Sequence, residues 1–243
     1  MMNMKLISSF SSSFLLLVLL ASAWKLNEAT KELASRNDND FEIYILAQFW
    51  PAELCETEAS TQDCKSPNSY WNNHFTIHGL WPNNQDGSYP KNCPKVAFNQ
   101  SVIDDSIGFD TMLTYWPNLS DDSSEPESEY TSFWEHEWSK HGTCSGLSQE
   151  AWMSGAIQIA KGFTPRFVGK NVGKTVSKTD FVDAFGTYSK GMVIPLCKGG
   201  DYLEGIETCW SAKSDGEIGS HVACSSVIME HDNCGDSFTI PSF

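Results

Sequence analysis

The sequence predicts a single α+β domain that extends from about residue 41 to the C-terminus and is stabilised by disulfides. Strand-like segments occur at both ends of this range, and helical segments lie between them without any internal repeat. The chain has 243 residues, 40% of them hydrophobic and 12% aromatic, which excludes a disordered protein and allows one substantial core. Eight cysteines follow a segment typical of secreted proteins, which favours disulfides.

The first 23 residues are typical of a secretory signal peptide. Lys5 supplies a positive charge, residues 14–20 (FLLLVLL) form a short apolar run, and residues 21–23 (ASA) are small, as a signal peptidase requires. The apolar run is shorter than the roughly 20 residues that a transmembrane helix needs, so we expect no membrane association of the mature chain. Residues 24–40 are polar without periodicity and predict an irregular N-terminal segment before a domain spanning residues 41–243.

Two strands are predicted in the first part of the domain. Residues 41–50 (FEIYILAQFW) are rich in β-branched and aromatic side chains. Residues 75–78 (FTIH) alternate, so we expect the first and third side chains to face a core and Thr76 and His78 to face the other way. Short strand-like runs separated by glycine follow from Val193 onward.

Helices are predicted over residues 133–140, 149–161 and 177–188, the last starting near a Ser or Thr cap. Before them, residues 121–129 (DDSSEPESE) predict an acidic, proline-containing loop. The order of strands, then helices, then strands is that of an α+β domain.

The cysteines are expected to form disulfides. Zinc ligation or free buried thiols are the alternatives, but the sequence contains no CxxC pair of the kind that binds structural zinc. Eight cysteines permit 105 pairings, and their number and spacing do not select one. Asn99 (NQS) and Asn118 (NLS) are glycosylation sequons that a secretory route could use.

The formal net charge of −15 argues against a protein that holds nucleic acid by bulk electrostatics. One stretch, residues 161–178, contains basic residues and no acid. It is either a track for phosphates or a solvated face. Its basic residues are Lys161, Arg166, Lys170, Lys174 and Lys178.

Two histidine-containing segments carry the residues expected for catalysis, NHFTIHGLWPN at 73–83 and FWEHEWSKHGTC at 133–144. The second has HExxxH spacing rather than the HExxH of zinc proteases, so its two histidines lie about 140° apart on an ideal helix. Glu137 and His141 share a face instead, and a carboxylate beside an imidazole favours the protonated ring. Acidic surroundings are thus expected to raise the histidine pKa values and to place the pH optimum below neutral. Two imidazoles with Lys140 form a metal-free set for general acid–base catalysis of phosphoryl transfer.

These two segments resemble the active-site segments of the ribonuclease T2 family. ILAQFWPAELC at 45–55 is similar to the opening strand of that family, and KNCP at 91–94, GFTP at 162–165 and PLC at 195–197 also fit. The resemblance covers about residues 41–240. It implies one domain with a central antiparallel sheet flanked by helices.

The resemblance also implies an activity. Members cleave single-stranded RNA by attack of the ribose 2′-OH on phosphorus, which gives a 2′,3′-cyclic phosphate and then a 3′-phosphate. DNA lacks this nucleophile and is not expected to be cut. No metal, no cofactor and no second subunit are expected.

The family's catalytic roles carry over by position. His141 is the expected general base and His78 the general acid. His136 is expected to hold the phosphate, while Glu137 and Lys140 stabilise the pentacovalent transition state.

The residues that would bind bases are less strongly marked. Trp81 and Tyr89 match stacking positions, and stacking tolerates sequence variation. Asn83 stands where some members carry Asp, which leaves the base preference open. Low base specificity is expected. Trp81 and Phe133 could alternatively be core aromatics. The expected substrate-binding residues are Gln48, Trp81, Asn83, Tyr89, Asn118 and Phe133.

The resemblance implies the disulfides Cys55–Cys64, Cys93–Cys144, Cys197–Cys234 and Cys209–Cys224. The destination is expected to be extracellular or vacuolar.

A catalytically lapsed storage or defence protein is one alternative to an active ribonuclease, and retention of all five expected catalytic residues argues against it. A self-incompatibility ribonuclease is another; those members tend to be basic, so the acidic charge favours the plant S-like branch.

Overall fold

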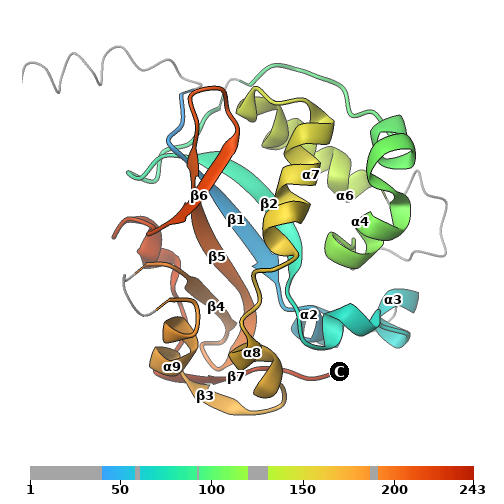
Figure 1. The fold of residues 1–243 in the computed structure, drawn as a ribbon. Coiled ribbons are helices and arrows are strands. Elements are labelled where there is room, and N and C mark those ends of the chain that lie inside the picture. Colours follow the sequence, from blue (N-terminus) through green and yellow to red (C-terminus); the bar gives the residue numbers. More distant parts are fainter. Residues whose placement is uncertain (1–39, 58–60, 92, 120–130, 187–190) are drawn as a thin grey trace, which may run out of the picture. The chain divides into compact units, whose positions relative to one another are not determined.

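The structure is a computed structural model that describes residues 40–57, 61–91, 93–119, 131–186 and 191–243 (Figure 1). Residues 41–243 form one compact unit. The predicted signal peptide, the polar segment up to residue 39 and the acidic loop at 121–129 lie outside the described residues and stay predictions.

One mixed sheet forms the centre of this unit. Its strands run in the order β2-β1-β5-β7-β3, with β4 and β6 both pairing with β5. All pairings are antiparallel except the short contact between β5 and β7. The α+β fold with a largely antiparallel sheet is confirmed. The strands are β1 (Ile43–Phe49), β2 (Thr76–Asn83), β3 (Thr175–Ser177), β4 (Ile194–Lys198), β5 (Tyr202–Ala212), β6 (Ile218–Val222) and β7 (Ser237–Thr239).

The helices of the described residues are mostly short. Two predicted helices agree closely with α6 and α7, and Ser148 caps α7 by accepting a hydrogen bond from the Ala151 N–H. The α-helices are α2 (Pro51–Thr57), α3 (Gln62–Lys65), α4 (Phe109–Tyr115), α6 (Ser132–Lys140), α7 (Gln149–Ala160), α8 (Arg166–Lys170) and α9 (Lys178–Asp183). The 3₁₀ helices are η1 (Ser69–Asn72), η3 (Gly142–Ser145) and η4 (Ile228–His231), and η2 (Ile103–Ile107) is a π-helix. Across the ranges described, none of the helices is both long and apolar enough to cross a membrane.

The third predicted helix is shorter than expected. Ser177 caps α9, as predicted, but the helix ends at Asp183 instead of continuing to residue 188. Gly186 adopts a φ of 140°, which is incompatible with a right-handed helix. The short helices α2, α4 and α8 were not predicted, because five to seven residues make fewer than two helical turns and are too few to show a repeating apolar pattern.

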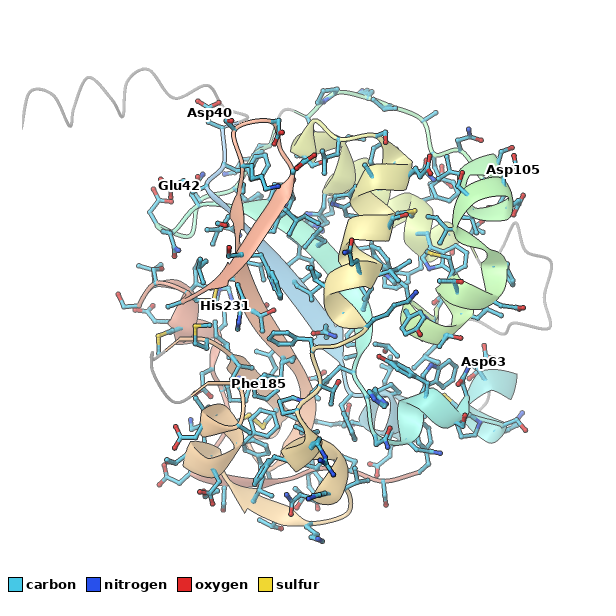
Figure 2. The ribbon with its side chains drawn as sticks, in the orientation of Figure 1. Asp40, Glu42, Asp63, Asp105, Phe185 and His231 are labelled. Atoms are coloured by element: carbon cyan, nitrogen blue, oxygen red, sulfur yellow. A yellow bond between two sulfur atoms is a disulfide. The ribbon has the colours of Figure 1, made fainter. Side chains whose placement is uncertain are left out.

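Strand β1 is buried on both faces. Tyr44 and Leu46 belong to the core beneath α4, α6 and α7, whereas Ile43 and Ile45 face a second cluster with residues of β4, β5 and η4. Figure 1 shows α7 lying across the sheet with α6 and α4 beside it, and Figure 2 shows that side chains fill the space between these layers. Burial on both faces explains why this strand reads as a nearly continuous apolar run.

The four disulfides implied by the resemblance are confirmed: Cys55–Cys64, Cys93–Cys144, Cys197–Cys234 and Cys209–Cys224. No cysteine in the described part of the chain is free. The disulfide Cys93–Cys144 joins η3, directly after α6, to the loop that follows β2. It therefore anchors the end of the histidine-containing segment 133–144.

Candidate active site

A β-bulge places His78 at the edge of the sheet. Ala47 of β1 lies opposite Gly79, but the next residue, Gln48, lies opposite Ile77, so His78 is an extra residue in β2. Its carbonyl oxygen accepts a hydrogen bond from the Trp116 indole at 2.9 Å. The bulge reverses the alternation of side chains, and this brings His78 and Trp81 together with ring centroids 5.1 Å apart.

The faces predicted for residues 75–78 agree in part with the structure. Phe75 and Ile77 are buried in core clusters, as expected. Thr76 is also buried, at 1% exposure, whereas the His78 side chain is 33% exposed. Of the two polar residues, only His78 is therefore open to a substrate.

Glu137 of α6 reaches across the edge of the sheet to β2. Its side chain is 3% exposed; Oε2 accepts a hydrogen bond of 2.8 Å from the Trp81 indole, and Oε1 lies 3.9 Å from His78 Nε2. This approach depends on Gly79, because a Cβ there would lie 2.1 Å from Oε2 and 2.2 Å from the Trp81 nitrogen. The carboxyl group thus faces Trp81 and His78 rather than His141.

His141 stands at the point where α6 ends. Its N–H donates to the Glu137 carbonyl at 3.0 Å, and its own carbonyl accepts from the Cys144 N–H at the start of η3. Gly142 allows this sharp change of direction beside the core, since a Cβ there would lie 2.3 Å from the Trp138 ring. The His141 ring lies against Trp81 with centroids 5.3 Å apart. One indole therefore contacts both His78 and His141.

His136 and Lys140 complete the group from the exposed face of α6. They are four residues apart on the helix and so lie on one face. Both are exposed, and both act electrostatically on His78 and His141. The structure thus brings together all five residues that the sequence marked as catalytic.

Burial and positive neighbours, rather than carboxylates, dominate the electrostatics of the site. Burial, then His136 and Lys140, lowers the pKa of His78 to about 4. Burial and then Lys140, His136 and His78 lower the pKa of His141 to about 3. Burial raises the pKa of Glu137 to about 7 against the opposing effects of Trp81 and Lys140. The expectation that acidic surroundings raise the histidine pKa values is therefore wrong, because the nearest carboxyl group is itself buried and neutral at acidic pH.

Two of the expected base-binding aromatics lie in the site. Trp81 contacts the imidazoles of His78 and His141, and the Phe133 ring centroid lies 5.9 Å from that of His78, although each aromatic also packs against a hydrophobic cluster. Tyr89 is 54% exposed, with Lys91 Nζ 5.3 Å from its ring centroid.

The other expected base-binding residues differ in accessibility. Gln48 is 2% exposed, and its amide nitrogen and oxygen both lack a hydrogen-bond partner. Asn83 is partly buried and accepts a hydrogen bond from the Asn84 N–H. Asn118 is buried, whereas Asn99 is exposed, so burial favours Asn99 as the sequon open to glycosylation. Their roles stay predictions.

Within the described ranges, no group of three or more His, Cys, Asp or Glu side chains is placed to hold a metal ion.

Sequence reasoning missed three residues that shape the site, Gly79, Trp116 and Phe49. Phe49 stacks on His78 with centroids 4.2 Å apart and planes inclined by 17°. The glycine directly after His78 was the one available signal; the other two contacts join segments that are distant in sequence.

Residues 41–219 match the Ribonuclease T2 family. The chain belongs to this family. Its curated relatives include ribonucleases of plants: "Intracellular ribonuclease LX" of Solanum lycopersicum is 40% identical over 49% of this chain and 48% of its own length. "Extracellular ribonuclease LE" of the same plant is 35% identical over 63% of this chain and 61% of its own. The chain thus spans about half to three fifths of these two relatives. "Ribonuclease 1" of Arabidopsis thaliana is 30% identical over 86% of this chain and 90% of its own length.

Solved structures of the family share the fold. Ribonuclease MC1 from the seeds of bitter gourd has a TM-score of 0.60 at 25% identity, covering 82% of this chain and 100% of its own. RNase NT in complex with 5′-AMP has a TM-score of 0.59 at 25% identity, covering 84% of this chain and 100% of its own. Trichomaglin, described as an S-like ribonuclease, is 19% identical with a TM-score of 0.62 over 83% of this chain and 98% of its own, which supports the fold alone.

Proposed function

We propose that this protein is an endoribonuclease that cleaves single-stranded RNA without a metal or cofactor. The 2′-OH attacks the adjacent phosphorus, the 5′-oxygen leaves, and the 2′,3′-cyclic phosphate that forms is then hydrolysed to a 3′-phosphate. The observation that carries the proposal is the position of Trp81: its ring contacts His78 and His141, while its N–H binds Glu137. Two imidazoles held by one rigid side chain can serve one reacting phosphate from two directions.

Each group has a role in this reaction. His141 removes the proton from the 2′-OH, and His78 protonates the departing 5′-oxygen. His136 binds the phosphate, and Lys140 stabilises the negative charge that grows on it. Glu137, neutral at acidic pH, donates a hydrogen bond to the same phosphate oxygens.

The low histidine pKa values suit an enzyme that works at acidic pH. In the free enzyme, burial and then the nearby His136 and Lys140 disfavour protonation of both rings. The negative charge of an arriving RNA phosphodiester opposes this effect and so favours protonation of His78, the form that an acid catalyst needs. The proposed acidic optimum thus has a different cause from the one first expected.

Further properties belong to the same proposal. We propose a monomeric enzyme that has low base specificity and does not cleave DNA. The side chains proposed to contact the bases are those of Gln48, Trp81, Asn83, Tyr89, Asn118 and Phe133. We also propose a secretory route to the cell exterior or the vacuole. One relative is named as an extracellular ribonuclease and another as an intracellular one.

The test is cleavage of homopolymeric RNAs in EDTA, with the 2′,3′-cyclic products quantified, for wild type and His141→Ala. We expect activity in EDTA and a loss of about 10²–10⁴-fold in the variant, the usual contribution of a general base. His231→Ala serves as the matched control, since this half-exposed histidine pairs with Glu207 away from the catalytic group. Wild-type rates in His141→Ala with an unchanged melting temperature would overturn the mechanism, and so would a requirement for a metal.

A further inference from the structure

Three rings and one lysine form a continuous chain of contacts beside the start of β2. His74 stacks on Tyr70 with centroids 4.2 Å apart and planes inclined by 10°. Tyr70 meets Tyr115, at the end of α4, edge-on at 4.9 Å. Lys161, just after α7, places its Nζ 4.6 Å from the centroid of Tyr115. We call these four residues the aromatic–lysine ladder.

The ladder is open to solvent. Its three rings are partly exposed, and Lys161 is exposed. The His74 ring is held in place by its Nδ1, which lies 3.0 Å from the Tyr70 carbonyl oxygen, while no described residue pairs with its Nε2. The Tyr70 hydroxyl is buried without a hydrogen-bond partner. A partly exposed aromatic ring, held in place by a second ring, is a surface on which an unpaired nucleic acid base can stack.

Basic side chains continue from the ladder along α8. The Phe75 N–H donates to Thr164 Oγ1 at 3.3 Å, and a Cβ on Gly169 would lie 3.3 Å from the Asn73 Cβ. The hydrogen bond and this close approach place the segment after Lys161 beside the residues that flank His74. Arg166 and Lys170 of α8 are exposed there, in a stretch that contains no acid.

The basic side chains at positions 161–178 differ in what their charged groups contact. Lys178 bonds both carboxylate oxygens of Asp232 and the Cys234 carbonyl, so it is already neutralised. Lys174 bonds the Lys170 carbonyl and has no described aromatic partner. Among the basic residues at positions 161–178, only Lys161 is both exposed and in contact with an aromatic ring.

The ladder lies within reach of a substrate bound at the active site. His74 precedes His78 by four residues, a separation of about 13 Å in extended chain. We propose that the aromatic–lysine ladder is a remote subsite for single-stranded RNA, where a base of the substrate stacks on His74 and Lys161 meets a neighbouring phosphate. This inference rests on the proposed ribonuclease function. In a chain with a net charge of −15, such a local subsite holds a long substrate where bulk electrostatics does not.

The first test measures binding without cleavage. A 2′-O-methyl octanucleotide, which lacks the nucleophile, is titrated against wild type, His74→Gln, Lys161→Gln and the matched control Lys174→Gln. We expect Lys161→Gln to reduce the slope of log K against log salt by about 0.7, the value for one contact to a single-stranded phosphate, and Lys174→Gln to leave the slope unchanged. We expect His74→Gln to weaken binding about fivefold or more at fixed salt, and to leave binding of a duplex of the same length unchanged, since paired bases cannot stack on the ring.

The second test compares substrates of different length. We expect His74→Gln and Lys161→Gln to lower kcat/KM for an octanucleotide while leaving that for a dinucleotide within twofold of wild type. Equal effects of Lys161→Gln and Lys174→Gln, or unchanged binding in both ladder variants, would overturn the proposal. If the wild type binds the oligomer through the ladder but cleaves no RNA, the proposed function fails and the subsite stands. Melting temperatures of all variants exclude unfolding as the cause.

Discussion

Replacing Gly79 with alanine adds one methyl group at the most crowded point of the site. That methyl would lie 2.1 Å from Glu137 Oε2 and 2.2 Å from Trp81 Nε1, the two atoms joined by a hydrogen bond of 2.8 Å. Ordinary contacts begin near 3.4 Å. The carboxyl group and the indole must therefore both retreat, and the hydrogen bond between them is broken.

The size of the effect follows from this displacement. The carboxyl group must move by about 1 Å or more, and a misplacement of about 1 Å at a catalytic site costs on the order of 100-fold in rate. The indole also contacts His78 and His141, so its movement disturbs both imidazoles. Overpacking of this kind costs about 1–3 kcal/mol of stability, which a fold held by four disulfides should tolerate.

The assay is kcat/KM for RNA cleavage together with thermal unfolding, for wild type, Gly79→Ala and the control Gly162→Ala. Nothing lies within 4 Å of a Cβ at Gly162, so the control should retain wild-type activity. We expect a loss of about 100-fold in Gly79→Ala while the protein remains folded. Activity within threefold of wild type would refute the idea that the contact of Glu137 with β2 matters for catalysis.

Three further predictions concern charge and stability. Burial, His136 and Lys140 lower the pKa of His78 to about 4, so kcat/KM should fall as the pH rises above about 4. Lys140→Gln should move this fall to higher pH, and an unmoved profile would contradict the electrostatic account. The folded-state pKa of Glu137, about 7, lies above its ordinary value of 4.5, so the stability it contributes is complete below about pH 4.5 and is lost as the pH rises through 7. Glu137→Gln should therefore unfold at a higher temperature than wild type at pH 8, with a gain of at most about 3 kcal/mol in the free energy of unfolding. At pH 4 the two unfolding temperatures should be equal, and the opposite order would disprove the burial effect. Replacing Cys209 and Cys224 with alanine opens a loop of 15 residues and should cost about 3 kcal/mol in chemical denaturation, and an unchanged midpoint would show that the bond does not constrain the unfolded chain.

Local patterns predicted the elements that are long or strongly marked. The strand β1 and the helices α6 and α7 follow from runs of β-branched residues and from helical periodicity. The disulfides followed only from the family resemblance, since eight cysteines alone leave 105 pairings open. The end of α9 was misplaced because Gly186 interrupts a pattern that otherwise continues.

The sequence by itself determined the family and predicted the catalytic residues in two segments, because motifs such as HGLWPN and EHEWSKHG are contiguous in the chain. Tertiary structure decided how these residues act on one another. The bond from Trp81 to Glu137 joins residues 56 positions apart, and the bulge at His78 exists only in the pairing of β2 with β1. The sequence predicted raised histidine pKa values, whereas those of His78 and His141 are lowered. The direction of these shifts depends on burial and on the distances between charges. Both are properties of the folded chain, because they arise where separate segments exclude water together.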